Sequence, residues 1–138
     1  MLERLVLLAA FAALVTIGVL ATQAWTARRT RRLQVGNALL SALGQEPDGR
    51  RTLVTFSTPS CAACQTAQAP AVHQVEQRLG ASSLRVVRID AASQPDLANA
   101  FGILTVPSTV VLDASGKVAA VNHGFAPSQR LVQQLTKA

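Results

Sequence analysis

Residues 52–64 read TLVTFSTPSCAAC, which is a short apolar run, a turn and two cysteines three positions apart. The run from Thr52 to Ser57 is β-prone and typical of a buried strand. A turn at 58–60 follows, and the sequence from Cys61 to Leu79 predicts a helix that ends at Gly80. The two cysteines therefore stand in the first turn of a helix that follows a buried strand.

The position of the two cysteines at the start of a helix favours reactivity of the first one. The first turn of a helix has unpaired N–H groups and the positive end of the helix dipole, which favour a thiolate at Cys61. Cysteines three apart in such a turn also close a disulfide with little change in the backbone. We expect Cys61 to attack a substrate disulfide and Cys64 to resolve the mixed disulfide. Two cysteines in 138 residues exclude a disulfide scaffold, so they are a redox pair or half of a metal site.

The sequence downstream alternates strands and helices. It predicts strands at 84–90, 108–112 and 117–122, a short helix at 96–101 and a final helix at 128–136. Strands separated by helices imply parallel pairing, and the hairpin around Gly116 adds antiparallel edges. The fold class is therefore α/β, with a central mixed sheet of about four strands flanked by helices.

The amino-terminal stretch has a different character. From Leu5 to Trp25 the chain carries no charge, and about 20 helical residues span a bilayer core. We expect one uncleaved transmembrane helix that contacts the lipid bilayer through Leu5 to Trp25. A signal peptide cleaved near Ala21 is the competing interpretation. The expected division is an anchor with its basic flank at 1–32, a connector at 33–50 and a domain at 51–138.

The distribution of charge predicts the orientation of the chain in the membrane and excludes nucleic acid as a partner. The net charge of the chain is +6. Residues 1–32 contain five arginines and one glutamate, whereas residues 33–138 contain eight basic and six acidic side chains. The high pI therefore reflects a local cluster and not a basic face for nucleic acid. Since the positive-inside rule keeps a basic flank in the cytoplasm, we expect a single-pass protein of the cell membrane whose domain faces the cytoplasm. The cluster consists of Arg28, Arg29, Arg31 and Arg32.

Taken together, these segments resemble the thioredoxin family. The resemblance covers about residues 50–138 and rests on FSTPSCAAC at 56–64, RID at 88–90, FGI at 101–103 and VPS at 106–108, with Gly116 and Gly124 also matching. It implies a thioredoxin-like fold and a cis peptide bond between Val106 and Pro107. It also implies that Pro107 packs against the active disulfide and that the Val106 backbone pairs with the substrate. With Ser60, these two residues form the expected substrate-binding set.

The chain departs from the family at several positions. Ser60 replaces the usual Trp, and Ala62-Ala63 replaces Gly-Pro between the cysteines. Thr55 and Val86 stand where thioredoxins have a buried aspartate and its lysine partner. Losing the carboxylate is expected to slow Cys64 or to leave its proton to water. The helix proline also comes one residue late, at Pro70, which predicts a different kink.

Metal binding is an alternative role for the cysteines. Cys61, Cys64, His73 and His123 can be drawn as a zinc site, but their spacing lacks the tight pairs of structural zinc. We expect no metal and no cofactor, and surface positions for both histidines. Asp90 ends its strand, and we expect it to start a turn.

Three functional hypotheses follow. The first is a membrane-tethered oxidoreductase that reduces a protein disulfide with electrons from a thioredoxin reductase or a small thiol. The second is a redox-sensing or partner-binding module with slow dithiol chemistry. The third applies if the topology is inverted, and it is thiol maintenance or cytochrome maturation on the outer side.

Overall fold

The computed structural model describes residues 1–24 and 38–138. The chain divides into two compact units, Met1–Gln34 and Val35–Ala138. Helix α1 runs over Leu2–Ala42, and its part from Leu2 to Ala24 is long and apolar enough to cross a membrane. A signal sequence would satisfy the same criterion of length and composition. Trp25, at the end of the expected span, and the arginine cluster lie outside the described residues.

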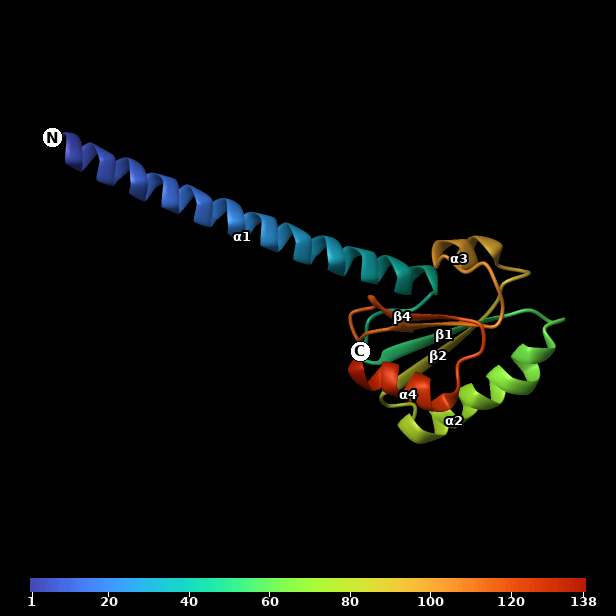
Figure 1. The fold of residues 1–138 in the computed structure, drawn as a ribbon. Coiled ribbons are helices and arrows are strands. Elements are labelled where there is room, and N and C mark those ends of the chain that lie inside the picture. Colours follow the sequence, from blue (N-terminus) through green and yellow to red (C-terminus); the bar gives the residue numbers. More distant parts are fainter. The chain divides into compact units, whose positions relative to one another are not determined.

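The second unit alternates strands and helices in the predicted order (Figure 1). Each predicted element is present, and the ends of the strands and of the last two helices lie within one residue of expectation, whereas the helix predicted from Cys61 to Leu79 contains a π-helical turn. The elements are β1 (Arg51–Ser57), the π-helical turn η1 (Cys64–Gln68), α2 (Ala69–Leu79), β2 (Leu84–Asp90), α3 (Pro95–Ala100), β3 (Ser108–Leu112), β4 (Val118–His123) and α4 (Ser128–Lys137).

The four strands form one mixed sheet in the order β2-β1-β3-β4. β1 pairs with β2 in parallel, as expected. The expectation that β3 is also parallel is wrong, because β3 joins the other edge of β1 and runs antiparallel to it. β4 then continues antiparallel from β3 through the hairpin. The carboxyl end of β1 thus lies beside the start of β3, which places the C-x-x-C turn near the Val106-Pro107 loop.

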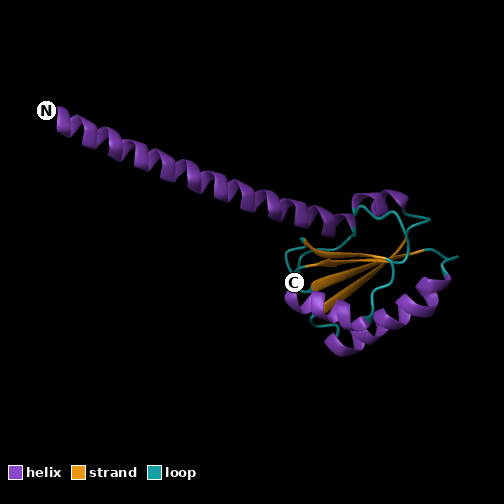
Figure 2. Ribbon diagram, viewed as in Figure 1, coloured by secondary structure: helices purple, strands orange, loops and turns teal.

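Helices cover both faces of this sheet (Figure 2). α2 and α4 lie on one face, and α3 lies on the other. Alternate residues of β1 supply the two cores, since Leu53 belongs to the α2 and α4 side and Val54 and Phe56 to the α3 side. Phe56 also packs against Phe101, with ring centroids 5.6 Å apart and planes tilted by 57°.

The end of α1 contributes to the α3-side core. Leu40 is only 2% exposed and packs with Val54, Phe56 and Val110. The helix ends at Ala42, just before Gly44, because a left-handed φ of 68° at Gly44 lets the Gln45 N–H donate to the Leu40 carbonyl. The segment interpreted as a connector therefore supplies part of the buried core.

Candidate active site

A short turn carries the chain from β1 into the cysteine-bearing helix. The Cys61 N–H donates to the Thr58 carbonyl at 3.1 Å, and Gln65 Nε2 donates to the Pro59 carbonyl at 2.9 Å. Cys61 precedes the first helical residue, and Cys64 begins η1. These bonds fix the turn at both ends and present the cysteines at the amino-terminal end of the helix.

Cys61 and Cys64 form a disulfide, with Cα atoms 5.3 Å apart. The two sulfurs have different surroundings, since Cys61 is half-buried whereas Cys64 is only 5% exposed. The Cys64 N–H donates to Cys61 Sγ at 3.1 Å. A backbone N–H aimed at a sulfur favours negative charge on it, so the local geometry supports a thiolate at Cys61 after reduction.

The proline loop lies next to this turn. The peptide bond between Val106 and Pro107 is cis, which confirms the expectation from the resemblance. Thr58 and Val106 line the same hollow, about 250 Å³ in volume, so the cysteine turn and the proline loop form one surface. Val106 is half-buried, Pro107 is buried, and Ser60 is exposed in the turn. Ser108 Oγ donates to the Thr105 carbonyl at 2.7 Å and fastens the loop to the start of β3.

Behind Cys64 is a small cavity of about 80 Å³ that contains no acidic side chain. Thr55, at the position where thioredoxins have their aspartate, lies buried in its wall together with Gln68. A second hollow of about 290 Å³ adjoins Cys64, and Asp90 is the acidic residue that lines it. Asp90 also starts a turn, as predicted, because its Oδ1 accepts from the Ala92 N–H at 2.9 Å.

Gln68 is the residue that reasoning from the sequence missed. It is 4% exposed, and its side-chain amide bonds both backbone groups of Ala126. The late position of Pro70 in the sequence was a sign of an irregular helix here. The structure shows that η1 is a π-helical turn, closed by the bond from the Ala69 N–H to the Cys64 carbonyl. Such a turn takes up one residue more than an α-helical turn, which accounts for the displaced proline.

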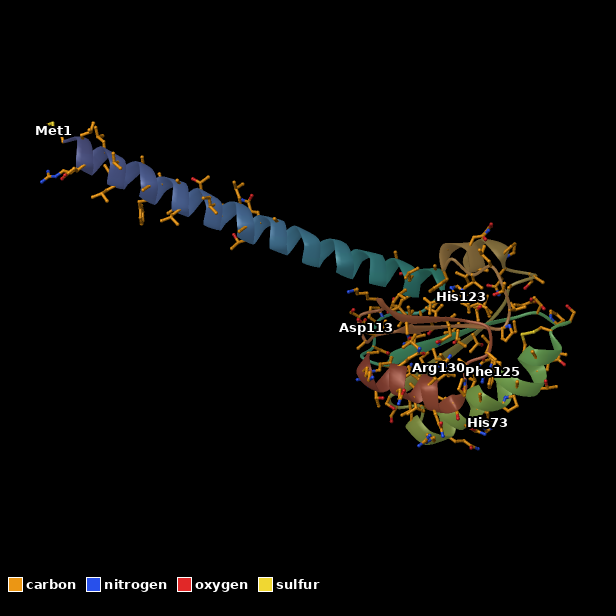
Figure 3. All side chains as sticks on the ribbon, viewed as in Figure 1. Met1, His73, Asp113, His123, Phe125 and Arg130 are labelled. Carbon is orange, nitrogen blue, oxygen red and sulfur yellow. A yellow bond between two sulfur atoms is a disulfide. The ribbon has the colours of Figure 1, made fainter. Side chains whose placement is uncertain are left out.

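The two histidines lie on separate elements (Figure 3). His73 is exposed on α2, and His123 is exposed at the end of β4. Among residues 1–24 and 38–138, no three His, Cys, Asp or Glu side chains form a group that would hold a metal ion.

Comparison with known proteins agrees with this geometry. The thioredoxin family model matches residues 41–137. Thioredoxin of Bacillus subtilis is 29% identical over 85 residues, which cover 62% of this chain and 79% of that protein. Thioredoxin 1 of Nostoc sp. is 31% identical over 85 residues, which cover 62% of this chain and 77% of that protein.

Solved thioredoxin structures share the fold. A mutant thioredoxin from Halobacterium salinarum superposes with a TM-score of 0.58 at 23% identity, covering 66% of this chain and 76% of that one. Oxidised mitochondrial thioredoxin 3 from Saccharomyces cerevisiae gives a TM-score of 0.59 at 16% identity, covering 73% of this chain and 88% of that one. With its close pair Cys61 and Cys64, the chain is a thiol–disulfide oxidoreductase and belongs to the thioredoxin family.

Proposed function

We propose that this protein is a membrane-tethered oxidoreductase that reduces a disulfide in a partner protein. The observation that carries the proposal is the asymmetry of the pair, in which Cys61 is accessible and receives an N–H bond while Cys64 is buried behind it. An accessible, stabilised thiolate suits the attacking role, and a protected thiol suits the resolving role.

The exchange has two steps. The Cys61 thiolate attacks one sulfur of the partner's disulfide, so that a mixed disulfide forms and one partner thiolate leaves. The Cys64 thiolate then attacks Cys61 Sγ, which forms the Cys61–Cys64 disulfide and releases the second partner thiolate. The partner gains two electrons and this domain loses them. A thioredoxin reductase or a small thiol returns them by reducing the disulfide.

The surface beside Cys61 would hold the partner chain. We assign substrate contacts to Val106, Pro107 and Ser60, because the proline loop and the cysteine turn share one hollow and Ser60 stands exposed next to Cys61. Leu104, which lines the same hollow and is 89% exposed, gives this surface an apolar edge. A polypeptide with an apolar residue near its disulfide fits this surface.

The resolving step needs a route for the Cys64 proton. The cavity that contains Thr55 has no carboxylate, so the proton leaves by the hollow that Asp90 lines, through water. This route is less direct than a buried carboxylate beside the thiol. We therefore expect slower resolution than in a thioredoxin that has the buried acid.

The apolar helix supports the tether, and residues 1–32, 33–50 and 51–138 are the proposed anchor, connector and domain. Following the arginine cluster in the sequence, we place the domain in the cytoplasm. A reporter fused after Ala138 tests this orientation, since a reporter that works only outside the cytoplasm would reverse it. The mass of the mature protein separates an anchor from a cleaved signal peptide.

A trapping experiment tests the cysteine roles. In the Cys64→Ser variant, the mixed disulfide on Cys61 has no resolving thiol and should accumulate with client proteins. The Cys61→Ser variant should trap nothing and reduce nothing. If Cys61→Ser traps partners as readily as Cys64→Ser, the assignment of roles is wrong.

One observation favours a second candidate, a redox-sensing or partner-binding module. The buried Thr55 leaves the cavity behind Cys64 without a carboxylate, which suits slow dithiol chemistry. The number of trapped partners and the turnover rate separate the two functions. Rapid turnover of several clients supports the reductase, and a single stable partner supports the module.

A further inference from the structure

The side chain of Gln68 connects the cysteine-bearing helix to the loop after β4. Its Nε2 donates to the Ala126 carbonyl at 3.1 Å, and its Oε1 accepts from the Ala126 N–H at 2.9 Å. Gln68 is 4% exposed and Ala126 is fully buried, so water does not compete for these bonds. One amide thus satisfies both backbone groups of a buried residue, as a neighbouring strand would.

The same loop is bonded to the proline loop. Two residues before Ala126, the Gly124 N–H donates to the Pro107 carbonyl at 2.9 Å. Gly124 has a φ of 85°, a left-handed conformation that glycine adopts without strain. The segment from Gly124 to Ala126 is therefore held by the proline loop at one end and by the helix at the other. Phe125, between them, is 48% exposed (Figure 3).

The helix side of this connection begins at Cys64. Cys64 and Gln68 are the first and last residues of the π-helical turn η1, and both line the cavity behind the disulfide. A path of neighbouring residues thus runs from Cys64 through Gln68, Ala126 and Gly124 to Pro107, with hydrogen bonds between Gln68 and Ala126 and between Gly124 and Pro107. The π-helical turn, with its extra residue, keeps Gln68 facing inward beside Cys64. An inserted residue that serves a functional site is a common reason for such a turn.

We propose that Gln68 is a positioning residue that sets the spacing between the Cys61–Cys64 pair and the Pro107 loop, and thereby the reactivity toward polypeptide disulfides. This inference rests on the proposed function, in which that loop holds the partner chain. A polypeptide substrate contacts the Pro107 loop while its disulfide meets the Cys61 thiolate, so its reaction depends on the spacing between the two. A small disulfide needs the thiolate alone, so the two substrates should respond differently to a change at Gln68.

The test compares two disulfides on the reduced full-length chain in detergent micelles. Second-order rate constants are measured by stopped flow for a disulfide-bonded peptide and for 2-hydroxyethyl disulfide. For Gln68→Leu we expect the peptide rate constant to fall about tenfold, equivalent to about 1.4 kcal/mol, and the small-disulfide rate constant to change less than twofold. An equal fall for both substrates, or no fall for the peptide, overturns the proposal.

Gln134→Leu is the matched control. Gln134 also makes a two-bond amide pair, with the Asn122 side chain, at 2.9 and 2.8 Å, but it does so from α4. Its loss removes two amide bonds away from the active site and should leave the ratio of the two rate constants unchanged. A shift in this ratio as large as that of Gln68→Leu would also overturn the proposal, since it would show a general effect of lost amide bonds.

Gln68→Glu adds a pH-dependent readout and replaces Gln68→Leu if that variant does not fold. A neutral carboxylic acid accepts from the Ala126 N–H and donates to the Ala126 carbonyl, whereas a carboxylate cannot donate. The ratio of peptide to small-disulfide rate constants should therefore approach the wild-type value at low pH and fall as pH rises. A ratio that stays parallel to the wild type at every pH contradicts the inference.

Hydrogen exchange separates this inference from the proposed function. Gln68→Leu should speed exchange of the amides in residues 124–126 more than Gln134→Leu does, whether or not the protein reduces either disulfide. A wild-type chain that reacts with neither disulfide refutes the proposed reductase. Unchanged exchange in Gln68→Leu refutes the role of Gln68, and faster exchange with unchanged peptide kinetics does so as well.

Discussion

The substitution Leu40→Ala tests whether the end of α1 belongs to the folded domain. Leu40 is 2% exposed and packs with residues of β1, α3 and β3. It nevertheless lies outside the strand-and-helix pattern that defines the family in the sequence. If this contact is part of the cooperative unit, its removal should lower the free energy of unfolding of the whole domain.

The size of the effect follows from its burial. Leu→Ala substitutions at fully buried positions cost about 2–5 kcal/mol, depending on how far the surroundings collapse into the cavity. Because Leu40 is in the last turn of its helix, that turn can shift toward the sheet, and we expect about 2–3 kcal/mol. A domain of this size is stable by about 5–15 kcal/mol, so the loss is a substantial fraction of the total.

Labelling of Cys64 reports unfolding of this domain without a signal from the apolar helix. In a reduced Cys61→Ser background, Cys64 is the one remaining thiol and is buried. Its labelling by a pulse of thiol reagent, measured against guanidinium concentration for the full-length chain in micelles, gives the midpoint and slope of unfolding.

Leu104→Ala is the control, because Leu104 is 89% exposed and its truncation should change stability by less than about 0.5 kcal/mol. A loss below about 1 kcal/mol for Leu40→Ala would show that the sheet and helices from Arg51 onward fold without the end of α1. The reasoning from burial would then be refuted.

Three further perturbations test other parts of the structure. Burial raises the pKa of Asp113, but hydrogen bonds from Ser115 and the Lys117 N–H outweigh it and lower the pKa overall. Asp113 therefore contributes stability above its unfolded pKa of about 3.9, and this contribution is lost as pH falls through the folded value. The stability difference between wild type and Asp113→Asn, from denaturation midpoints, should shrink between pH 6 and pH 2, and a constant difference contradicts this. Arg85→Ala removes the ion pair to Asp48 and the hydrogen bond to the Glu46 carbonyl, so we expect the free energy of unfolding to fall by about 1–3 kcal/mol. A denaturation midpoint equal to that of wild type would show that these two interactions do not hold the 45–50 segment. Asp90→Asn should slow the decay of the mixed disulfide about tenfold in quenched-flow experiments without changing its formation, and an unchanged decay would leave the Cys64 proton to water alone.

Local features of the sequence predicted the elements well. A β-prone run before a helix with cysteines in its first turn is specified by neighbouring residues, and so is the helix end at Gly80. The direction of β3 was not specified in this way. A strand that follows a helix is parallel to its neighbour only if the connection carries the chain back to the opposite end of the sheet. Here β3 starts at the end where β1 finishes, with Ser108 beside Phe56, so the two strands are antiparallel. The burial of Leu40 likewise depends on contacts with residues far away in the sequence.

The same distinction between local pattern and long-range contact applies to the residues of the active site. The cysteines were found from local pattern, and the cis bond at Pro107 from resemblance to a family. Gln68 escaped both approaches, because its partner Ala126 is 58 residues away and its position differs from the family pattern by the inserted residue. The late Pro70 marked the insertion, but only the three-dimensional structure shows which side chain it turns inward.

Among the residues that the structure describes, no acidic side chain lines the cavity behind Cys64. Thr55 and Gln68 are both neutral, Arg88 in the same lining carries a positive charge, and an amide keeps the same donors and acceptors over the physiological pH range. The contacts that join the helix to the proline loop therefore do not change as pH changes. If the cysteine roles are as proposed, the pH dependence of exchange should reflect the two thiols, whereas the fit to a partner chain should not vary with pH. In a thioredoxin with a buried aspartate, the same cavity would hold a group that titrates, so replacing it with Thr55 separates proton transfer from the geometry of partner binding.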